Sequence, residues 1–144
     1  MTVGGRVCVV TGASAGIGRA TARALDRAGA TLVLAARREE RLRQLADELG
    51  ERASWVRCDV TAVEDLERLR DATLERHGRC DVLVNSAGVP GGGWFADLTI
   101  EQLRLVTETN YLSVLLGTKI FLPLLLQSGG HVVNVGSLAG RYAV

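Results

Sequence analysis

The chain has 144 residues, of which 47% are apolar, and its 17 Lys and Arg nearly balance its 16 Asp and Glu, for a formal net charge of +1. This length and apolar content suit one domain with its own hydrophobic core. The near-neutral charge argues against a nucleic-acid or anionic-membrane partner, because both require a clustered basic excess. We therefore expect a small-molecule ligand, no nucleic-acid partner and no membrane partner.

The cysteines, the N-terminus and the most apolar run bear on cellular location. Cys8, Cys58 and Cys80 are widely spaced and form no Cys-x-x-Cys pair, so we expect reduced thiols, no metal site and a cytoplasmic protein. The N-terminus lacks the basic and apolar regions of a signal peptide. The most apolar run, 111–126, is 16 residues long and contains a lysine and a proline. It is short for the roughly 20 residues that a membrane-spanning helix needs.

Short apolar runs alternate along the chain with longer stretches in which apolar residues recur at helical spacing. Strands are expected at 7–10, 31–35, 53–57, 82–85 and 131–135. Helices are expected at 17–28, 38–49 and 62–76. A last helix should begin at Thr99, where Gln102 completes a capping-box pattern, and should run toward Pro123 and the glycine pair at 129–130.

This order predicts an α/β protein with a doubly wound parallel sheet of the Rossmann type, strand order 3-2-1-4-5, and helices on both faces in three layers. Residues 1–144 would form a single domain. Only the stretch from Val89 to Asp97, with three consecutive glycines, has the composition of a flexible loop. Ligands of such sheets bind at the carboxyl ends of the strands, where the strand order reverses. We therefore expect functional residues just after the first, fourth and fifth strands.

A glycine-rich turn separates the first strand from the first helix. Residues 11–18 read Thr-Gly-Ala-Ser-Ala-Gly-Ile-Gly. Gly12, Gly16 and Gly18 would allow a tight turn, a close approach of a pyrophosphate to the backbone, and close packing of the helix on the strand. The free N–H groups at the helix N-terminus would face the anion. A purely structural turn is the alternative, but three glycines in this setting favour dinucleotide binding.

At this point the chain resembles the short-chain dehydrogenase/reductase family. Residues 11–18 match its Thr-Gly-x-x-x-Gly-Ile-Gly motif, and residues 85–88 are similar to its Asn-Asn-Ala-Gly motif, with Ser86 in place of the second asparagine. Asn110 matches the family's active-site asparagine, and the segment that ends at Ser137 is similar to the one that carries its catalytic serine. The resemblance implies an oxidoreductase that interconverts a carbonyl and an alcohol by hydride transfer. It does not identify the substrate.

The resemblance also implies a dinucleotide-binding domain and assigns its cofactor-binding residues. They are Gly12, Ser14, Gly16, Ile17, Gly18, Arg37, Asp59, Val60, Asn85, Ala87 and Gly88. Asp59 would accept a hydrogen bond from the adenine amino group, and an acid at a helix N-terminus is the alternative. Asn85 would lie under the adenosine ribose, and it could also tie adjacent strands together.

The choice between NAD and NADP depends on the residue after the second strand. An acidic residue there would bind the ribose 2′-hydroxyl of NAD, but this position holds Ala36, and Arg37 and Arg38 follow it. A guanidinium without a carboxylate favours a 2′-phosphate and therefore NADP(H), with NAD(H) still possible. Arg37 is the first candidate for this contact, and the Ser14 hydroxyl is a second donor. The alternative is that Arg37 belongs to an ordinary arginine-rich helix surface.

The resemblance assigns two catalytic residues and shows that two others are missing. Ser137 would orient the carbonyl, and Asn110 would support a water relay. The family also uses a tyrosine and a lysine four residues later, but neither Tyr111 nor Tyr142 has a lysine at that spacing, and the single lysine is Lys119. The chain is therefore expected to be a dinucleotide-binding domain that is incomplete at its C-terminus relative to the family. We expect it to be inactive alone.

Two functions of different classes remain open. In the first, the chain is the cofactor-binding portion of an NADP(H)-dependent carbonyl reductase or alcohol dehydrogenase, whose missing residues come from a longer chain or a second polypeptide. In the second, it is a non-catalytic dinucleotide-binding or interaction module. Motif retention through Asn110 and Ser137 favours the enzyme.

The last helix bears on assembly. Its apolar residues Leu112, Leu115, Leu116 and Phe121 are expected to lack a cover, and the fifth strand is expected to be a free edge. In the family this helix commonly packs against a partner subunit. The resemblance therefore implies a homo-oligomer.

Overall fold

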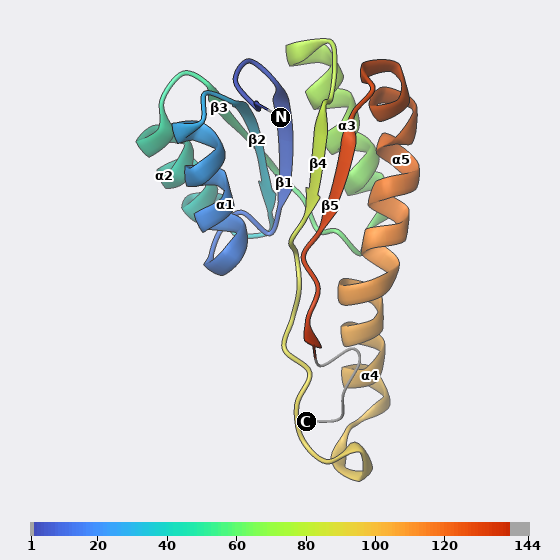
Figure 1. Ribbon diagram of the computed structural model, residues 1–144. Coiled ribbons are helices and arrows are strands. Elements are labelled where there is room, and N and C mark those ends of the chain that lie inside the picture. Colours follow the sequence, from blue (N-terminus) through green and yellow to red (C-terminus); the bar gives the residue numbers. More distant parts are fainter. Residues whose placement is uncertain (1, 139–144) are drawn as a thin grey trace.

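The computed structural model describes residues 2–138, and five parallel strands form one sheet in this part of the chain (Figure 1). The strands are β1 (Val7–Thr11), β2 (Thr31–Ala36), β3 (Ala53–Arg57), β4 (Val82–Asn85) and β5 (His131–Asn134). Their spatial order is β3-β2-β1-β4-β5. The predicted strand order and parallel pairing are confirmed.

Helices cover both faces of the sheet (Figure 1). They are α1 (Gly16–Arg27), α2 (Glu39–Leu49), α3 (Val63–His77), α4 (Ile100–Thr107) and α5 (Ser113–Ser128), with a 3₁₀ turn, η1 (Phe95–Asp97), before α4. Side chains of α1 and α2 pack on one face, and those of α3 and α5 pack on the other. The predicted capping box is present, because the Gln102 N–H donates to the Thr99 hydroxyl at 3.2 Å and the Thr99 N–H donates to Gln102 Oε1 at 2.8 Å.

β1 lies in the middle of the sheet and is buried on both faces. Val7 and Val9 join the core beneath α3 and α5, whereas Cys8 and Val10 join the core beneath α1 and α2. Successive side chains of a strand point to opposite faces. An unbroken apolar run is therefore needed where helices cover both faces, which is why the first strand shows no alternation of apolar and polar residues.

The last helix has the predicted extent but is less regular than predicted. α4, a π-helical turn η2 (Glu108–Leu112) and α5 follow one another without a break, and the helical stretch from Ile100 to Ser128 includes Pro123. Its 29 residues are long and apolar enough to cross a membrane by length and composition alone. The sequence analysis judged only the apolar run 111–126, of 16 residues, as a membrane span, and this length is corrected here. Core helices satisfy the same criterion, and α5 packs against α3 and β4.

The inner face of α5 corrects the expectation that Phe121 lacks a cover. Phe121 is fully buried, and Leu116 packs against the same core. Leu112 and Leu115 are exposed. Leu112 and Phe121 are separated by about two and a half helical turns, so they lie on opposite sides of the helix. β5 pairs with β4 along one edge and has no second strand partner in the described part of the chain.

Candidate functional site

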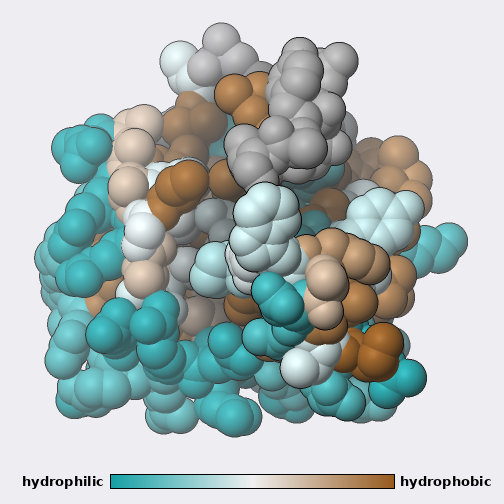
Figure 2. All heavy atoms as spheres, turned by 90° about the horizontal axis from the view of Figure 1, so that it is seen from below, coloured by the Kyte–Doolittle hydropathy of each residue, from teal (hydrophilic) through white to brown (hydrophobic). Residues whose placement is uncertain are grey.

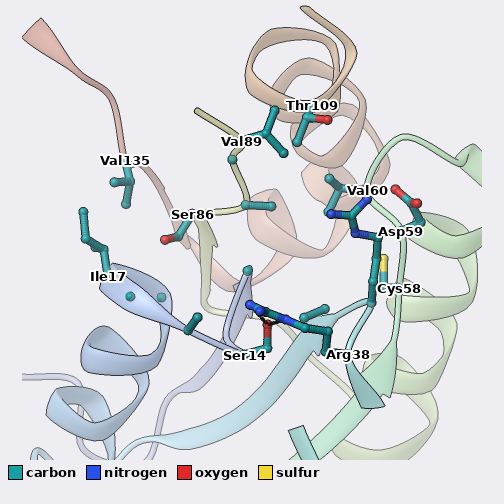
Figure 3. A pocket seen from close by; sticks show the side chains of 18 residues that line it. Ser14, Ile17, Arg38, Cys58, Asp59, Val60, Ser86, Val89, Thr109 and Val135 are labelled. Atoms are coloured by element: carbon teal, nitrogen blue, oxygen red, sulfur yellow. Dashed lines mark hydrogen bonds between the residues drawn. The ribbon is translucent and has the colours of Figure 1, made fainter. Parts of the chain in front are cut away.

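A pocket of about 460 Å³ lies at the carboxyl ends of the strands, beside the start of α1 (Figure 3). All of the predicted cofactor-binding residues except Asn85 line it. The other lining residues are Ala15, Ala36, Arg38, Cys58, Ser86, Val89, Thr109 and Val135. The pocket therefore lies where the strand order predicted a ligand site.

The glycine-rich turn between β1 and α1 forms one wall of the pocket. Gly12 has a φ of +68°, and a Cβ atom there would lie 2.7 Å from the Cα of Ala87. A Cβ atom on Gly18 would lie 2.5 Å from the carbonyl oxygen of Gly12. Gly12 thus lets the turn pack on the segment after β4, and Gly18 lets α1 pack on the turn. The first N–H groups of α1, which have no carbonyl partner within a helix, begin at Gly16 beside the pocket.

Thr11 ties the end of β1 to the segment after β4. Its hydroxyl donates to the Val84 carbonyl at 3.3 Å and accepts from the N–H groups of Ser86 at 3.1 Å and Ala87 at 3.3 Å. The residue is buried, so its hydroxyl satisfies two backbone donors in a place with little access to water. The sequence analysis included Thr11 in the motif but gave it no role. Its place at the end of an apolar strand could have indicated that its hydroxyl pairs with backbone groups of a neighbouring segment.

Two arginines follow β2 at the rim of the pocket. Nε and Nη2 of Arg38 donate to the Ser14 hydroxyl at 3.2 Å and 3.0 Å (Figure 3). Arg37 also lines the pocket, and both arginines are exposed. Ala36 brings no carboxylate to this position. The sequence analysis chose Arg37 as the first candidate, but Arg38 is the arginine that contacts Ser14.

The segment after β3 forms another wall of the pocket. Oδ1 of Asp59 accepts from the Thr61 N–H at 3.1 Å and from the Thr61 hydroxyl at 2.8 Å. Asp59 therefore stabilises the turn before α3, and it also lines the pocket. Burial, aided by nearby carboxylates, raises the pKa of the Cys58 thiol to about 12. This thiol stays protonated at neutral pH and is no nucleophile.

Asn85 is buried and lies outside the pocket wall. Its Nδ2 donates to Oδ1 of Asn134 at 2.9 Å and to the Thr118 hydroxyl at 3.3 Å. These contacts join β4 to β5 and to α5. The interpretation of Asn85 as a tie between strands is confirmed, and its contact with the adenosine ribose stays a prediction.

Asn110 lies in the π turn η2 rather than in regular α-helix, which corrects the sequence prediction. Its Oδ1 accepts from the Val89 N–H and its Nδ2 donates to the Val89 carbonyl, both at 2.9 Å. The two bonds hold the segment after β4 against the helix. Ser137 is exposed and follows β5, and Tyr142 lies outside the described residues. The catalytic roles of Asn110 and Ser137 stay predictions.

Two hydroxyls of the pocket wall are buried without a hydrogen-bond partner among the described residues. They are the hydroxyls of Ser86 and Thr109. Buried polar groups in folded proteins are nearly always paired. Together with the glycine-rich turn, the N-terminus of α1 and the two arginines, these hydroxyls fit a ligand with phosphates and several hydrogen-bonding groups, as a dinucleotide has.

The family model for short chain dehydrogenase matches residues 6–144. The chain belongs to the short-chain dehydrogenase/reductase family. Uncharacterized oxidoreductase YxnA of Bacillus subtilis is 41% identical to it over 140 residues, which cover 94% of this chain and 39% of that protein. The family resemblance read from the motifs is confirmed, and the family is one of oxidoreductases.

Solved structures of the family share the fold. A short chain dehydrogenase/reductase from Burkholderia phymatum in complex with NAD superimposes with a TM-score of 0.95 at 34% identity, covering 100% of this chain and 53% of that one. A single-residue variant of actinorhodin polyketide ketoreductase with NADPH superimposes with a TM-score of 0.92 at 42% identity. The match covers 97% of this chain and 56% of that one. The chain therefore spans between 39% and 56% of the length of these relatives.

Replacing Gly12 with alanine should damage the protein more than the same change at another glycine with a left-handed backbone. Gly12→Ala adds a Cβ atom 2.7 Å from the Ala87 Cα, whereas Gly78→Ala, at a φ of +69°, meets nothing within 4 Å. Gly78→Ala thus carries only the backbone cost, about 1–2 kcal/mol. We expect Gly12→Ala to lower the free energy of unfolding by about 2 kcal/mol more, measured by urea denaturation. Equal losses would contradict the packing role of Gly12.

Proposed function

We propose that the chain is the cofactor-binding portion of an NADP(H)-dependent oxidoreductase that interconverts a small-molecule carbonyl and an alcohol by hydride transfer. The observation that carries this proposal is the pair Arg37 and Arg38 at the pocket rim beside Ser14, where Ala36 stands in place of a carboxylate. Guanidinium groups favour the 2′-phosphate that distinguishes NADP from NAD. The ketoreductase with NADPH supports this choice, and the Burkholderia phymatum protein with NAD shows that relatives differ.

The pocket residues would divide the dinucleotide between them. The turn from Gly12 to Gly18 and the N-terminus of α1 would hold the pyrophosphate. Arg37 and Arg38 would hold the 2′-phosphate, and the wall formed by residues 58–60 would contact the adenine. When bound, the nicotinamide ring supplies or accepts the hydride.

The residues assigned to catalysis act on the substrate side. The Ser137 hydroxyl would orient the carbonyl through a hydrogen bond. Asn110 would support the water relay that delivers the proton. Its amide also holds the backbone of Val89, so it keeps the segment after β4 in place while the reaction proceeds.

NADPH should bind at least about ten times more tightly than NADH, because two guanidinium groups at the pocket rim would pair with the 2′-phosphate. Arg37→Asp should reduce or reverse this ratio, since a carboxylate repels the phosphate and accepts from a 2′-hydroxyl. Arg41→Asp is the matched control, because Arg41 is an exposed residue of α2 outside the pocket wall. Fluorescence titrations give the dissociation constants. Equal constants for the two cofactors in the unmodified protein would refute the preference.

The 144-residue chain alone should not oxidise NADPH in the presence of a carbonyl compound. Neither Tyr111 nor Tyr142 is followed four residues later by a lysine. Without a positioned acid the rate should fall by roughly 10²–10⁴-fold. The assay follows NADPH absorbance with a panel of carbonyl compounds, and carbonyl-dependent oxidation by the purified chain would contradict this expectation.

The second candidate is a non-catalytic dinucleotide-binding or interaction module. The reading frame beyond the Val144 codon separates the two candidates. An open frame with a Tyr-x-x-x-Lys motif about a dozen residues after Ser137 supports the enzyme. A stop codon directly after Val144 supports the module.

Exposed apolar residues near α4 and α5 support a homo-oligomer. Trp94 and Phe95 are 83% and 77% exposed, and Leu112, Leu115 and Leu126 are also exposed. Figure 2 views the face at which the strands end, and hydrophobic residues gather over its middle and right, whereas its left and lower margins are hydrophilic. Apolar patches of this kind are commonly covered by association. Light scattering of the purified chain should give at least the mass of a dimer, and a monomer would argue against the proposal.

A cytoplasmic location rests on the cysteines. Cys8, Cys58 and Cys80 are all free and buried. Burial is also the main reason why the pKa of Cys8 is raised to about 11 and that of Cys80 to about 12. Free thiols in the core suit a reducing compartment, and they would be unusual in an oxidising one.

A further inference from the structure

β3 forms one edge of the sheet, and no other strand in the described part of the chain pairs with its outer side (Figure 1). An open strand edge can pair with a further strand, and proteins usually protect such edges with proline, lysine or a bulge. β3 reads Ala-Ser-Trp-Val-Arg, so it has neither proline nor lysine, and only its last residue is charged. Its register with β2 runs without a bulge over the whole strand. This edge is therefore open to a further strand.

The backbone groups that β3 leaves unpaired follow from its hydrogen bonds to β2. The Leu32 N–H donates to the Arg52 carbonyl at 2.7 Å, and the Cys58 N–H donates to the Ala36 carbonyl at 3.0 Å. Alternate residues of a parallel strand bond to a given neighbour, so the even-numbered residues of β3 face β2. The odd-numbered residues therefore turn their N–H and carbonyl groups away from the sheet.

These outward groups are symmetric about Trp55, because Ala53 and Arg57 lie equally far before and after it. If two copies place their β3 strands antiparallel with Trp55 opposite Trp55, each Trp55 N–H meets the partner's Trp55 carbonyl. Each Arg57 N–H then meets the partner's Ala53 carbonyl. The Ala53 N–H needs no partner, because it already donates to the Gly50 carbonyl at 2.9 Å. One twofold arrangement thus satisfies every outward N–H of the strand.

Two hollows along this edge give a second strand room. One, of about 580 Å³, lies toward α2, and the other, of about 370 Å³, lies toward α3. Ser54, Trp55 and Arg76 line both hollows. Trp55 is half-buried and packs against the core beneath α1 and α2, so the hollow toward α2 gives the partner's Trp55 space beside it. Aromatic pairs across antiparallel strands are stabilising.

The charges along the edge are complementary in the same arrangement. Arg57 lies opposite the partner's Ala53, and the partner's Glu51, in the turn before β3, is its diagonal neighbour, within reach of long side chains. Arg57 and Glu51 are exposed, and neither forms an ion pair among the residues that the structure describes. The twofold therefore brings each Arg57 near a carboxylate, and within β3 no like charges lie opposite each other.

We propose that a second copy of this chain docks on this edge, with the two β3 strands antiparallel about Trp55, so that one sheet runs through both copies. The contact is separate from the exposed apolar residues near α4 and α5, because α5 packs on β4 and β5 at the other side of the sheet (Figure 1). The inference goes beyond the proposed function and does not depend on which cofactor binds.

Single cysteine variants test the register, because the twofold places residue 55 opposite its own copy. Trp55→Cys brings two thiols onto Cα atoms about 5.5 Å apart, which a disulfide can bridge. Arg57→Cys is the matched control, since the two thiols would then be separated along the strands by about four residues, or ~13 Å. The native cysteines are free and buried. Each protein is oxidised with copper phenanthroline, the unmodified chain gives the background, and the dimer is followed by non-reducing electrophoresis.

Trp55→Cys should form the cross-linked dimer at least about ten times faster than Arg57→Cys, because only its thiols lie within disulfide reach. Equal rates for the two variants would overturn the proposed register. So would a rate for Trp55→Cys that does not exceed that of the unmodified chain.

Charge reversal is a second test, and it keeps the Trp55 side chain. Arg57→Glu should raise the dissociation constant of the dimer by about 3- to 10-fold, since it places carboxylates next to each other at two symmetric positions. Adding Glu51→Arg to this variant should restore the association, because the pair forms again with its signs exchanged. Analytical ultracentrifugation gives the constants, and the unfolding temperature of each variant is measured alongside. A double variant that associates as weakly as Arg57→Glu alone would contradict the pairing.

The outcomes also separate this contact from association through the apolar residues near α4 and α5. If the unmodified chain is a dimer or larger and Trp55→Cys cross-links no faster than Arg57→Cys, the copies associate through another surface. The inference is then wrong and the homo-oligomer stands. If the unmodified chain stays a monomer at high protein concentration, both proposals are wrong, and a strand of a different protein bound at β3 in that monomer would likewise refute the inference.

Discussion

The close packing of the glycine-rich turn on the segment after β4 is the contact on which the rest of the site depends. Gly12 has no side chain, so the backbone of Ala87 can approach it directly. The buried Thr11 hydroxyl pairs with the N–H groups of Ser86 and Ala87, so the approach leaves these two donors satisfied. β1 and β4 are neighbours in the centre of the sheet. The two walls that a dinucleotide must touch are therefore positioned by the most deeply buried strands.

The long helix provides the opposite side of the pocket, and it is held at three points. Phe121 anchors α5 in the core, and the Asn85 side chain links Thr118 of α5 to β4. Nearer the pocket, Asn110 holds the backbone of Val89 through both atoms of its amide. Asn110 belongs to the π turn itself, and the other two anchors follow this turn in α5. The irregular turn is thus tied to the segment after β4 by one of its own side chains.

The sequence predicted an element correctly where a single physical requirement, such as burial on both faces or capping of a helix, determines the residue pattern. The buried strands had to be unbroken apolar runs, and the Thr99 and Gln102 pair marked the start of α4, so the sheet order and most element boundaries were predicted correctly. The π turn left no signal, because one extra residue in a continuous helix changes neither composition nor capping. Phe121 was assigned to the wrong face because it was grouped with Leu112 by hydrophobicity and not by helical phase.

In the site, too, residues within a short motif could be predicted, whereas contacts between distant segments could not. The glycines and Asp59 could be found from a motif whose spacing is short and fixed. Whether Arg37 or Arg38 reaches Ser14 depends on how the chain leaves β2 and enters α2, which adjacent residues of the same type cannot reveal. The structural role of Asn85 depends on Asn134 and Thr118, which come together only after the sheet and α5 have formed.

The hydrogen bonds from Arg38 to Ser14 reduce the conformational entropy that the Arg38 side chain has left to lose when it binds an anion. A free arginine side chain samples many rotamers, and fixing it on an anion costs about 2 kcal/mol of conformational freedom. Two donors of Arg38 already rest on the Ser14 hydroxyl above the glycine-rich turn. If the proposed cofactor binds here, part of this ordering is complete before its phosphate arrives, because Ser14 holds the Arg38 side chain in place beforehand.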